Sequence, residues 1–140
     1  MTKMLVPVDG SEQAREAAKW AVKWAGEAGG TVTLLHVHVM PGAEVMAMAH
    51  LPREKIDEIE NKHAGPSFQQ VREAVGEEAV ADTIVAIGDA GEEIVGIARS
   101  KGFDHIVMGS RGLSPLKELL LGSVSEHVIR KAPCPVTIIR

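Results

Sequence analysis

Aromatic residues are scarce in this chain of 140 residues, which contains two tryptophans, two phenylalanines and no tyrosine. Proteins that bind single-stranded nucleic acid usually stack the bases on aromatic side chains, so this composition argues against that function. The formal net charge of −4 gives no overall attraction to nucleic acid or to an anionic membrane surface. An anion site in this protein therefore has to be local, built from backbone groups and a few side chains.

Cysteine is nearly absent as well, because Cys134 is the single one in the sequence. One cysteine excludes an internal disulfide and a cysteine-based zinc cluster, and it fits a reducing cytoplasm. No apolar run approaches the ~18 residues of a membrane span. Asp9 and Glu12 interrupt any signal-peptide pattern at the N-terminus. We therefore expect a cytoplasmic protein that binds neither membrane nor nucleic acid.

Apolar patterning alternates between strand and helix along the whole chain. The length predicts one domain, residues 1–140. Strands are predicted at Lys3–Val8, Thr31–Val39, Ala81–Ile87, Asp104–Met108 and Cys134–Ile139. Helices are predicted at Ser11–Ala28, Pro66–Glu78, Gly91–Lys101 and Ser123–Lys131. Repeated βα units indicate an α/β fold, a three-layer αβα domain with a five-stranded parallel sheet.

A glycine-rich stretch from Met108 to Ser125 carries the main indication of function. Gly109 and Gly112 can form a turn whose N–H groups converge on one point. Ser123 is the predicted N-cap of the next helix, in a capping box with Glu126, and a helix start offers free N–H groups to an anion. The two halves together suit a polyphosphate, with the hydroxyls of Ser123 and Ser125 as further donors. Each half alone is also compatible with an ordinary turn and an ordinary cap.

The spacing of these residues, Gly109-x2-Gly112-x9-Gly122-Ser123, resembles the ATP-binding signature of the universal stress protein family. Residues 3–11, KMLVPVDGS, are similar to the first strand and turn of that family. Leu34–Val37 is similar to its second strand, and Ala132–Val136 to the entry into its last strand. The resemblance is poor only from about Met40 to Gly65, where the family varies.

The resemblance implies the Rossmann-like strand order 3-2-1-4-5. In that order the first and fourth strands are neighbours at the topological switch point, where ligands bind at the carboxyl ends of the strands. Asp9 follows the first strand and Gly109 ends the fourth. Both are therefore expected to face the same crevice.

The resemblance also implies an adenine nucleotide as ligand, either ATP or its products ADP and AMP, and triphosphates usually carry Mg²⁺. The backbone of Val37 would contact the adenine edge, and Pro7 and Val8 would line the pocket around the base or ribose. Asp9 would accept hydrogen bonds from the nucleoside or lie near the magnesium ion. Arg111 either meets a phosphate or is solvated. The full set of predicted binding residues is Pro7, Val8, Asp9, Val37, Met108, Gly109, Arg111, Gly112, Gly122, Ser123, Val124 and Ser125.

No catalytic residue or protein ligand to a metal is predicted. The sequence has neither a Walker-type loop nor a G-x-G-x-x-G motif, and Asp9 is the one candidate base. We therefore expect an ATP-binding regulatory protein of the stress response with at most slow hydrolysis. The alternatives are a nucleotide hydrolase or transferase, and an interaction module without nucleotide.

The last strand, residues 134–139, would lie at an edge of the sheet in this order. An apolar edge strand needs protection, and pairing with the same strand of a second copy would provide it through a two-fold interface. The family resemblance also implies a homodimer. We therefore expect this strand to form the dimer contact.

Residues 40–65 are irregular and their role is open. Met40-Pro41-Gly42 ends a strand, a methionine-rich run follows, and Pro52 suits the first turn of a helix. This segment can be a lid over the nucleotide, a surface for a partner, or a loop that packs on its own core, and we favour the last.

Two side-chain pairs lie on single faces of their predicted elements. Trp20 and Trp24 are four residues apart on a helix, and we expect them to pack on the sheet rather than bind an aromatic ligand. His36 and His38 share a face of the second strand. Without a third ligand nearby in the sequence, we expect two histidines near the mouth of the sheet rather than a metal site.

Overall fold

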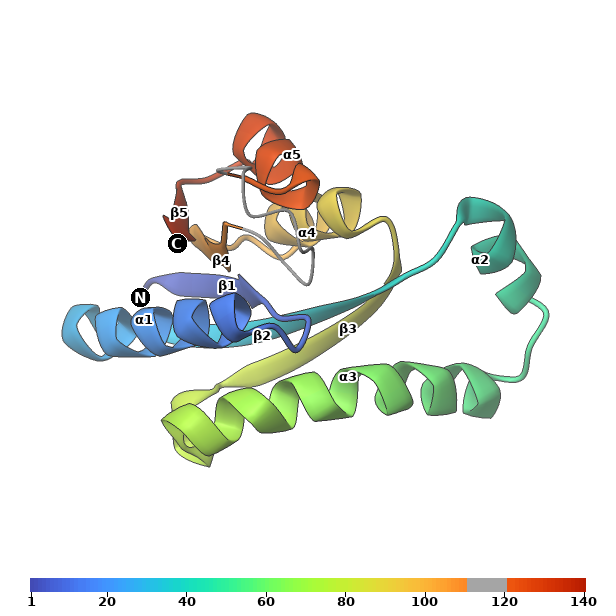
Figure 1. Cartoon of the computed structure of the whole chain (residues 1–140), viewed down its shortest axis with the longest axis horizontal. Helices are drawn as coiled ribbons and strands as arrows, with labels where there is room; N and C mark the ends of the chain where they lie inside the picture. The colour runs from blue at the N-terminus through green and yellow to red at the C-terminus, as the bar shows by residue number, and fades with distance from the viewer. Residues whose placement is uncertain (111–120) are drawn as a thin grey trace.

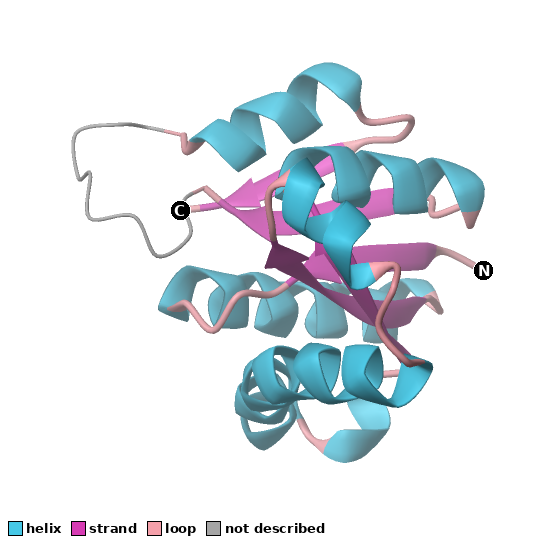
Figure 2. Cartoon of the chain, turned by 90° about the vertical axis from the view of Figure 1, so that its right-hand side faces the viewer, coloured by secondary structure: helices cyan, strands magenta, loops and turns pink. Residues whose placement is uncertain are grey.

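A computed structural model of the chain describes residues 1–110 and 121–140. Its strands are β1 (Lys3–Pro7), β2 (Thr31–Val39), β3 (Asp82–Gly88), β4 (His105–Gly109) and β5 (Val136–Ile139). They form one parallel sheet in the order β3-β2-β1-β4-β5. Figure 1 shows this arrangement, and Figure 2 shows helices on both faces of the sheet. The predicted α/β fold and strand order are confirmed.

The helices are α1 (Glu12–Ala28), α2 (Gly42–Met48), α3 (Arg53–Val75), α4 (Ala90–Ser100) and α5 (Ser123–Lys131), with a short 3₁₀ turn η1 (Glu77–Ala79). Ser11 caps the N-terminus of α1, because its hydroxyl accepts a hydrogen bond from the N–H of Ala14 at 3.1 Å. Its C-cap is Gly29 with φ of 73°. No helix among residues 1–110 and 121–140 is long and apolar enough to cross a membrane.

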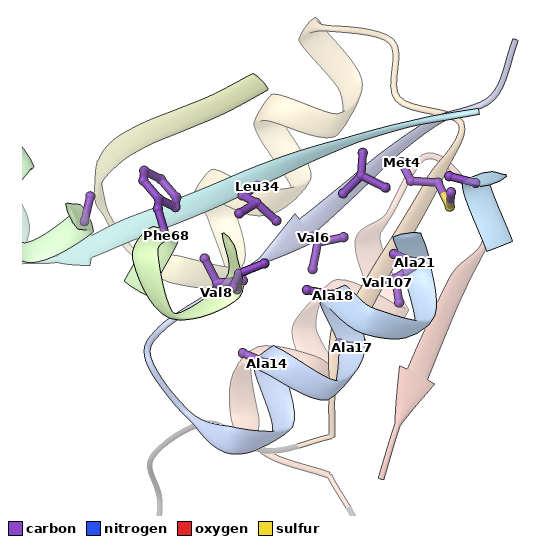
Figure 3. Close-up of a cluster of buried hydrophobic side chains, with 14 residues drawn as sticks. Met4, Val6, Val8, Ala14, Ala17, Ala18, Ala21, Leu34, Phe68 and Val107 are labelled. Atoms are coloured by element: carbon purple, nitrogen blue, oxygen red, sulfur yellow. The ribbon is translucent and has the colours of Figure 1, made fainter. Parts of the chain in front are cut away.

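The core has two parts, one on each face of the sheet. Met4 and Val6 of β1 belong to one cluster with the alanines of α1 and Phe68 of α3, as Figure 3 shows. Leu5, between them in sequence, points to the other face and joins Ile94 of α4 and Val128 of α5. Because alternate residues of β1 enter different clusters, the strand is buried on both faces. This explains its near-continuous apolar sequence.

Helix α3 differs from the prediction of a new helix at Pro66. The structure has one helix from Arg53 to Val75, with Pro66 inside it. Proline lacks the N–H that would bond the carbonyl of Lys62, so the helix loses one hydrogen bond there. Ala64 and Phe68 on either side are buried, and their packing keeps the helix continuous. The helix ends at Gly76, where φ is 92°, earlier than the predicted Glu78.

The preferred interpretation of the methionine-rich segment is wrong. We expected it to pack on its own core, but α2 has no buried residue. The side chain of Met46 is 75% exposed. Figure 1 shows α2 standing away from the other helices. The interpretations as a lid or as a partner surface therefore remain.

The two tryptophans follow the prediction only in part. Trp24 is half-buried and meets His105 of β4 edge-on, with ring centroids 5.0 Å apart. Trp20 stacks on Trp24 at 5.6 Å but is 38% exposed. Packing on the sheet is therefore right for Trp24 and wrong for Trp20.

The glycines of α4 allow a test of how closely α4 and α5 pack. A Cβ atom added to Gly91 would lie 2.8 Å from Cδ2 of His127 and 3.1 Å from its Cβ, so α5 would have to move. Gly96 in the same helix has open space at its Cβ position. We expect Gly91→Ala to destabilise the fold by about 1–3 kcal/mol and Gly96→Ala to stabilise it by roughly 0.5–1 kcal/mol. Urea unfolding of both variants measures this, and equal effects would contradict the close α4–α5 contact.

Candidate functional site

A cleft of about 170 Å³ lies at the carboxyl ends of β1 and β4. These two strands are hydrogen-bonded neighbours, while the helices after them, α1 and α5, pack on opposite faces of the sheet. The cleft therefore occupies the topological switch point. Its lining residues are Pro7, Val8, Asp9, Ser11, Ala14, Val37, Val39, Ala90, Ile94, Met108, Gly109, Val124 and Ser125.

One wall of the cleft is apolar and comes from the ends of β1 and β2. Val8 is buried there, whereas Val39 is 66% exposed. The backbone of Val8 is held on both sides, because its N–H donates to the carbonyl of Leu35 at 2.8 Å and its carbonyl is 2.9 Å from Nδ1 of His36. The buried ring of His36 also meets Phe68 of α3 edge-on. This wall is thus braced from behind by β2 and α3.

The turn between β1 and α1 places a carboxylate at the rim of the cleft. Asp9 is exposed, and its Oδ1 accepts a hydrogen bond from the N–H of Ser11 at 2.9 Å. Gly10 between them has φ of 87°, which residues with a Cβ rarely adopt. The side chain of Asp9 is therefore oriented by the turn that starts α1.

The opposite rim is the N-terminus of α5, which is fixed to the end of β4. The hydroxyl of Ser125 is within bonding distance of two carbonyls, at 2.9 Å from Gly109 and 3.1 Å from Ser110. The N–H of Gly122 donates to the carbonyl of Ser110 at 2.7 Å. Ser125 is only 2% exposed, so this connection is shielded from water. The backbone N–H groups of the first helical turn, which lack partners within the helix, thus open at the cleft.

The predicted capping box is wrong. The N-cap of α5 is Gly122 and no side chain caps this helix, so Ser123 is already the first helical residue. The side chain of Ser123 borders a separate depression with Glu126, His127, Arg130 and Lys131. The Ser125 hydroxyl, which was predicted as a further donor to the ligand, here directs its one proton to the carbonyls of Gly109 and Ser110.

Eight of the predicted residues line the cleft together, namely Pro7, Val8, Asp9, Val37, Met108, Gly109, Val124 and Ser125. Gly122 and Ser123 do not line it, and Arg111 and Gly112 lie outside the described residues. Sequence reasoning missed Val39, although it follows Val37 by two residues and so shares its strand face. It also missed Ser11, Ala14, Ala90 and Ile94, because they reach the cleft only through the packing of α1 and α4.

The two histidines of β2 have different surroundings. His36 is buried behind the wall of the cleft, while His38 stacks on His63 of α3. Among the described ranges 1–110 and 121–140, no group of three or more His, Cys, Asp or Glu side chains could hold a metal ion.

Known proteins match the chain along its full length. The family model of the universal stress protein family matches residues 1–140. Universal stress protein YxiE of Bacillus subtilis is 39% identical, over 99% of this chain and 98% of its own. The solved structure of MJ0577, a universal stress protein of Methanocaldococcus jannaschii, is 35% identical and has a TM-score of 0.76 over 99% of this chain and 94% of its own.

Other solved universal stress proteins share the fold at lower identity. The structure of UspA from Lactobacillus plantarum is 27% identical with a TM-score of 0.77, over 99% of this chain and 97% of its own. A universal stress protein solved in complex with cAMP is 22% identical with a TM-score of 0.65, over 99% of this chain and 96% of its own. The universal stress protein from Archaeoglobus fulgidus in complex with dAMP is also 22% identical with a TM-score of 0.65, over 100% of this chain and 98% of its own. The extent of these matches, on a chain with the same strand order, shows that it belongs to the universal stress protein family.

Proposed function

We propose that this protein binds an adenine nucleotide in the cleft between β1 and β4 and acts as a regulatory protein of the stress response. The observation that carries the proposal is the construction of the cleft, which has an apolar wall on one side and a helix N-terminus on the other. The universal stress proteins with cAMP and dAMP support the same class of ligand. ATP with Mg²⁺ is the form that we propose for this chain, since the resemblance to the ATP-binding signature includes Gly109 and Gly122.

The described residues fit the two halves of a nucleotide separately. The side chains of Pro7, Val8 and Val37 offer apolar surface to a base or ribose. The free N–H groups at the start of α5 and the positive end of its dipole suit phosphate oxygens, close to Val124 and Ser125. Because the chain has a net charge of −4, this local arrangement has to supply the attraction for phosphate. On sequence grounds we propose Arg111 and Gly112 as further phosphate contacts.

Hydrolysis of the bound nucleotide is proposed to be slow at most. Asp9 is the one acidic residue among the described residues that line the cleft, and its Oδ1 already accepts a hydrogen bond from Ser11. No second group is placed to activate a water molecule beside it in the described part of the lining. A turnover near the ~10 per second of typical enzymes would contradict this part of the proposal.

We also propose a cytoplasmic homodimer formed through β5. Among the described strands, β5 pairs with β4 alone. Pro135 and Ile139 direct their carbonyls toward β4, where they accept hydrogen bonds from Ile106 and Ser110. The alternating geometry of a strand then turns the backbone of Val136 and Ile138 to the other side, where a second β5 can pair with it.

The nucleotide site is tested by replacing Gly122 with aspartate and with asparagine. Gly122 has φ of −77° and ψ of 168°, which both residues adopt readily, and both are good N-caps. We expect each variant to keep or gain a few tenths of a kcal/mol in stability, roughly. A carboxylate at the start of α5 repels phosphate, so we expect ATP binding to fall by about tenfold or more in Gly122→Asp and by less in Gly122→Asn.

The measurement is release of nucleotide from purified protein by acid and chromatography, followed by titration with ATP and Mg²⁺. Thermal unfolding of both variants controls for the fold. Equal affinity of wild type and Gly122→Asp for ATP would place the phosphates elsewhere. Failure of the wild type to bind at millimolar ATP would instead favour an interaction module.

The dimer is tested by sedimentation at micromolar concentration. We expect the wild type to sediment with twice the mass of one chain. Ile138→Pro removes one outward N–H of β5 and should give a monomer. Ile138→Val keeps this N–H with a smaller side chain, so it should remain a dimer. A monomeric wild type would overturn the proposed interface.

A further inference from the structure

The two halves of helix α3 differ in how deeply they are buried. Its buried residues Ala64, Ser67, Phe68 and Val71 all lie in the second half. No residue from Arg53 to His63 is buried. The first half of α3 and α2 before it therefore contribute no buried residue to the core, and Figure 1 shows α2 apart from the other helices. Such segments have low local stability.

The boundary between the two halves carries a stacked pair of imidazole rings. His63 of α3 lies over His38 of β2, with ring centroids 4.1 Å apart and planes inclined by 17°. Pro66 follows within the same helical turn and leaves the carbonyl of Lys62 without its helical donor. The helix is therefore weakest next to the ring pair that ties it to β2.

Protonation of both rings changes the interaction between them from attraction to repulsion. Two neutral imidazole rings attract each other as a stacked pair, whereas two imidazolium rings at this distance repel each other. The titratable groups around His38 are His63 on α3, His36 on the same strand and Glu44 on α2, and its partner on β3 is the apolar Ile87. Burial is the main cause that lowers the pKa of His38, followed by His63 and His36, while Glu44 raises it.

The ring pair is connected to the cleft through the backbone of β2. His38 lies between Val37 and Val39, whose side chains line the cleft from the other face of the strand. His36, two residues earlier, is hydrogen-bonded to the carbonyl of Val8 in the same wall. A displacement at His38 is thus passed directly to the apolar wall.

We infer that His38 and His63 form a proton-sensitive clasp, and that acid releases the first half of α3 and α2 from β2 and loosens the wall of the cleft. The effect on ligand binding rests on the proposed nucleotide site, whereas the clasp itself does not. The protein would then hold its nucleotide less tightly in acid.

The sign of the pH effect follows from the lowered pKa of His38. With a pKa below the ordinary 6.5, His38 binds fewer protons in the folded state than in the unfolded state. Its contribution to stability is therefore complete above pH 6.5 and is lost as the pH falls below that value. Burial lowers the pKa of His105 as well, which gives a background of the same sign. A comparison between variants has to remove this background.

The test replaces His63 with phenylalanine, which keeps an aromatic ring on His38 but carries no proton. His50→Gln is the matched control, because His50 is an exposed histidine between α2 and α3. Thermal stability and the affinity for ATP with Mg²⁺ are measured at about pH 7.5 and about pH 5.5, on either side of the ordinary histidine pKa. We expect acid to weaken ATP binding by on the order of threefold to tenfold more in the wild type than in His63→Phe. His50→Gln should follow the wild type.

Loss of stability in acid that is equal in the wild type and His63→Phe would overturn the clasp. If the wild type fails to bind ATP at both pH values, the proposed function fails. The comparison of thermal stability between the wild type and His63→Phe at the two pH values then tests the clasp by itself. An NMR titration of the two rings in the wild type needs no variant. Coupled titration in two steps supports the clasp, and two independent titrations at the ordinary pKa contradict it.

Discussion

The pairing of β1 with β4 is the constraint on which the site depends. These strands are a hundred residues apart in the chain, yet Met4 lies beside His105 and Leu5 beside Ile106. Two hydrogen bonds fix the pairing at the amino ends of the strands. The N–H of Lys3 donates to the carboxylate of Asp104 at 2.8 Å, and the N–H of Asp104 donates to the carbonyl of Lys3 at 2.9 Å. Because both strands run parallel from these hydrogen bonds, their carboxyl ends emerge side by side. The turn of Asp9 and the N-terminus of α5 then face each other across one cleft.

The two rims of this cleft are built in different ways. Buried hydrogen bonds of Ser125 and Ser110 hold the start of α5 to β4 and leave little freedom there. The wall of β1 and β2 depends instead on side chains packed behind it, His36 on Phe68 and His38 on His63. The hydrogen bonds of Ser125 involve a hydroxyl and two backbone carbonyls, which do not titrate near neutral pH, whereas the contact between imidazole rings responds to the charge of the rings. We therefore expect the rim at the start of α5 to keep its geometry, and the apolar wall to be the part of the cleft that pH can change.

Sequence patterns predicted the features that depend on neighbouring residues. The strand predicted at Thr31–Val39 is β2 with the same bounds, and the helix predicted at Ser11–Ala28 is α1, which also ends at Ala28. The strand order followed from the family resemblance, since no local pattern specifies which strands pair. The predicted cleft residues came partly from that resemblance, as for Val37, and partly from the glycine turn and the helix start, as for Gly109 and Ser125. The predictions that failed did so because contacts between residues distant in sequence decided the local structure. Ser123 looked like a cap, but the bonds from Gly122 and Ser125 to the end of β4 start the helix one residue earlier. Pro66 looked like a helix start, but buried neighbours hold the helix together across it.

The two halves of helix α3 contribute to the cleft in different ways. Its second half supplies Phe68 to the core and Ser67 beside Gly10, whose added Cβ would lie 3.6 Å from the Ser67 hydroxyl. That half cannot vary freely without disturbing the turn that carries Asp9. The first half has no buried residue, so the core constrains its sequence less, and it carries a histidine that stacks on His38 of β2. One helix thus joins a buried support of the cleft to a more exposed segment, and Pro66 lies between the two. Under the proposed coupling, we expect a change in the exposed half to reach the cleft through β2 without any change in the residues that line it.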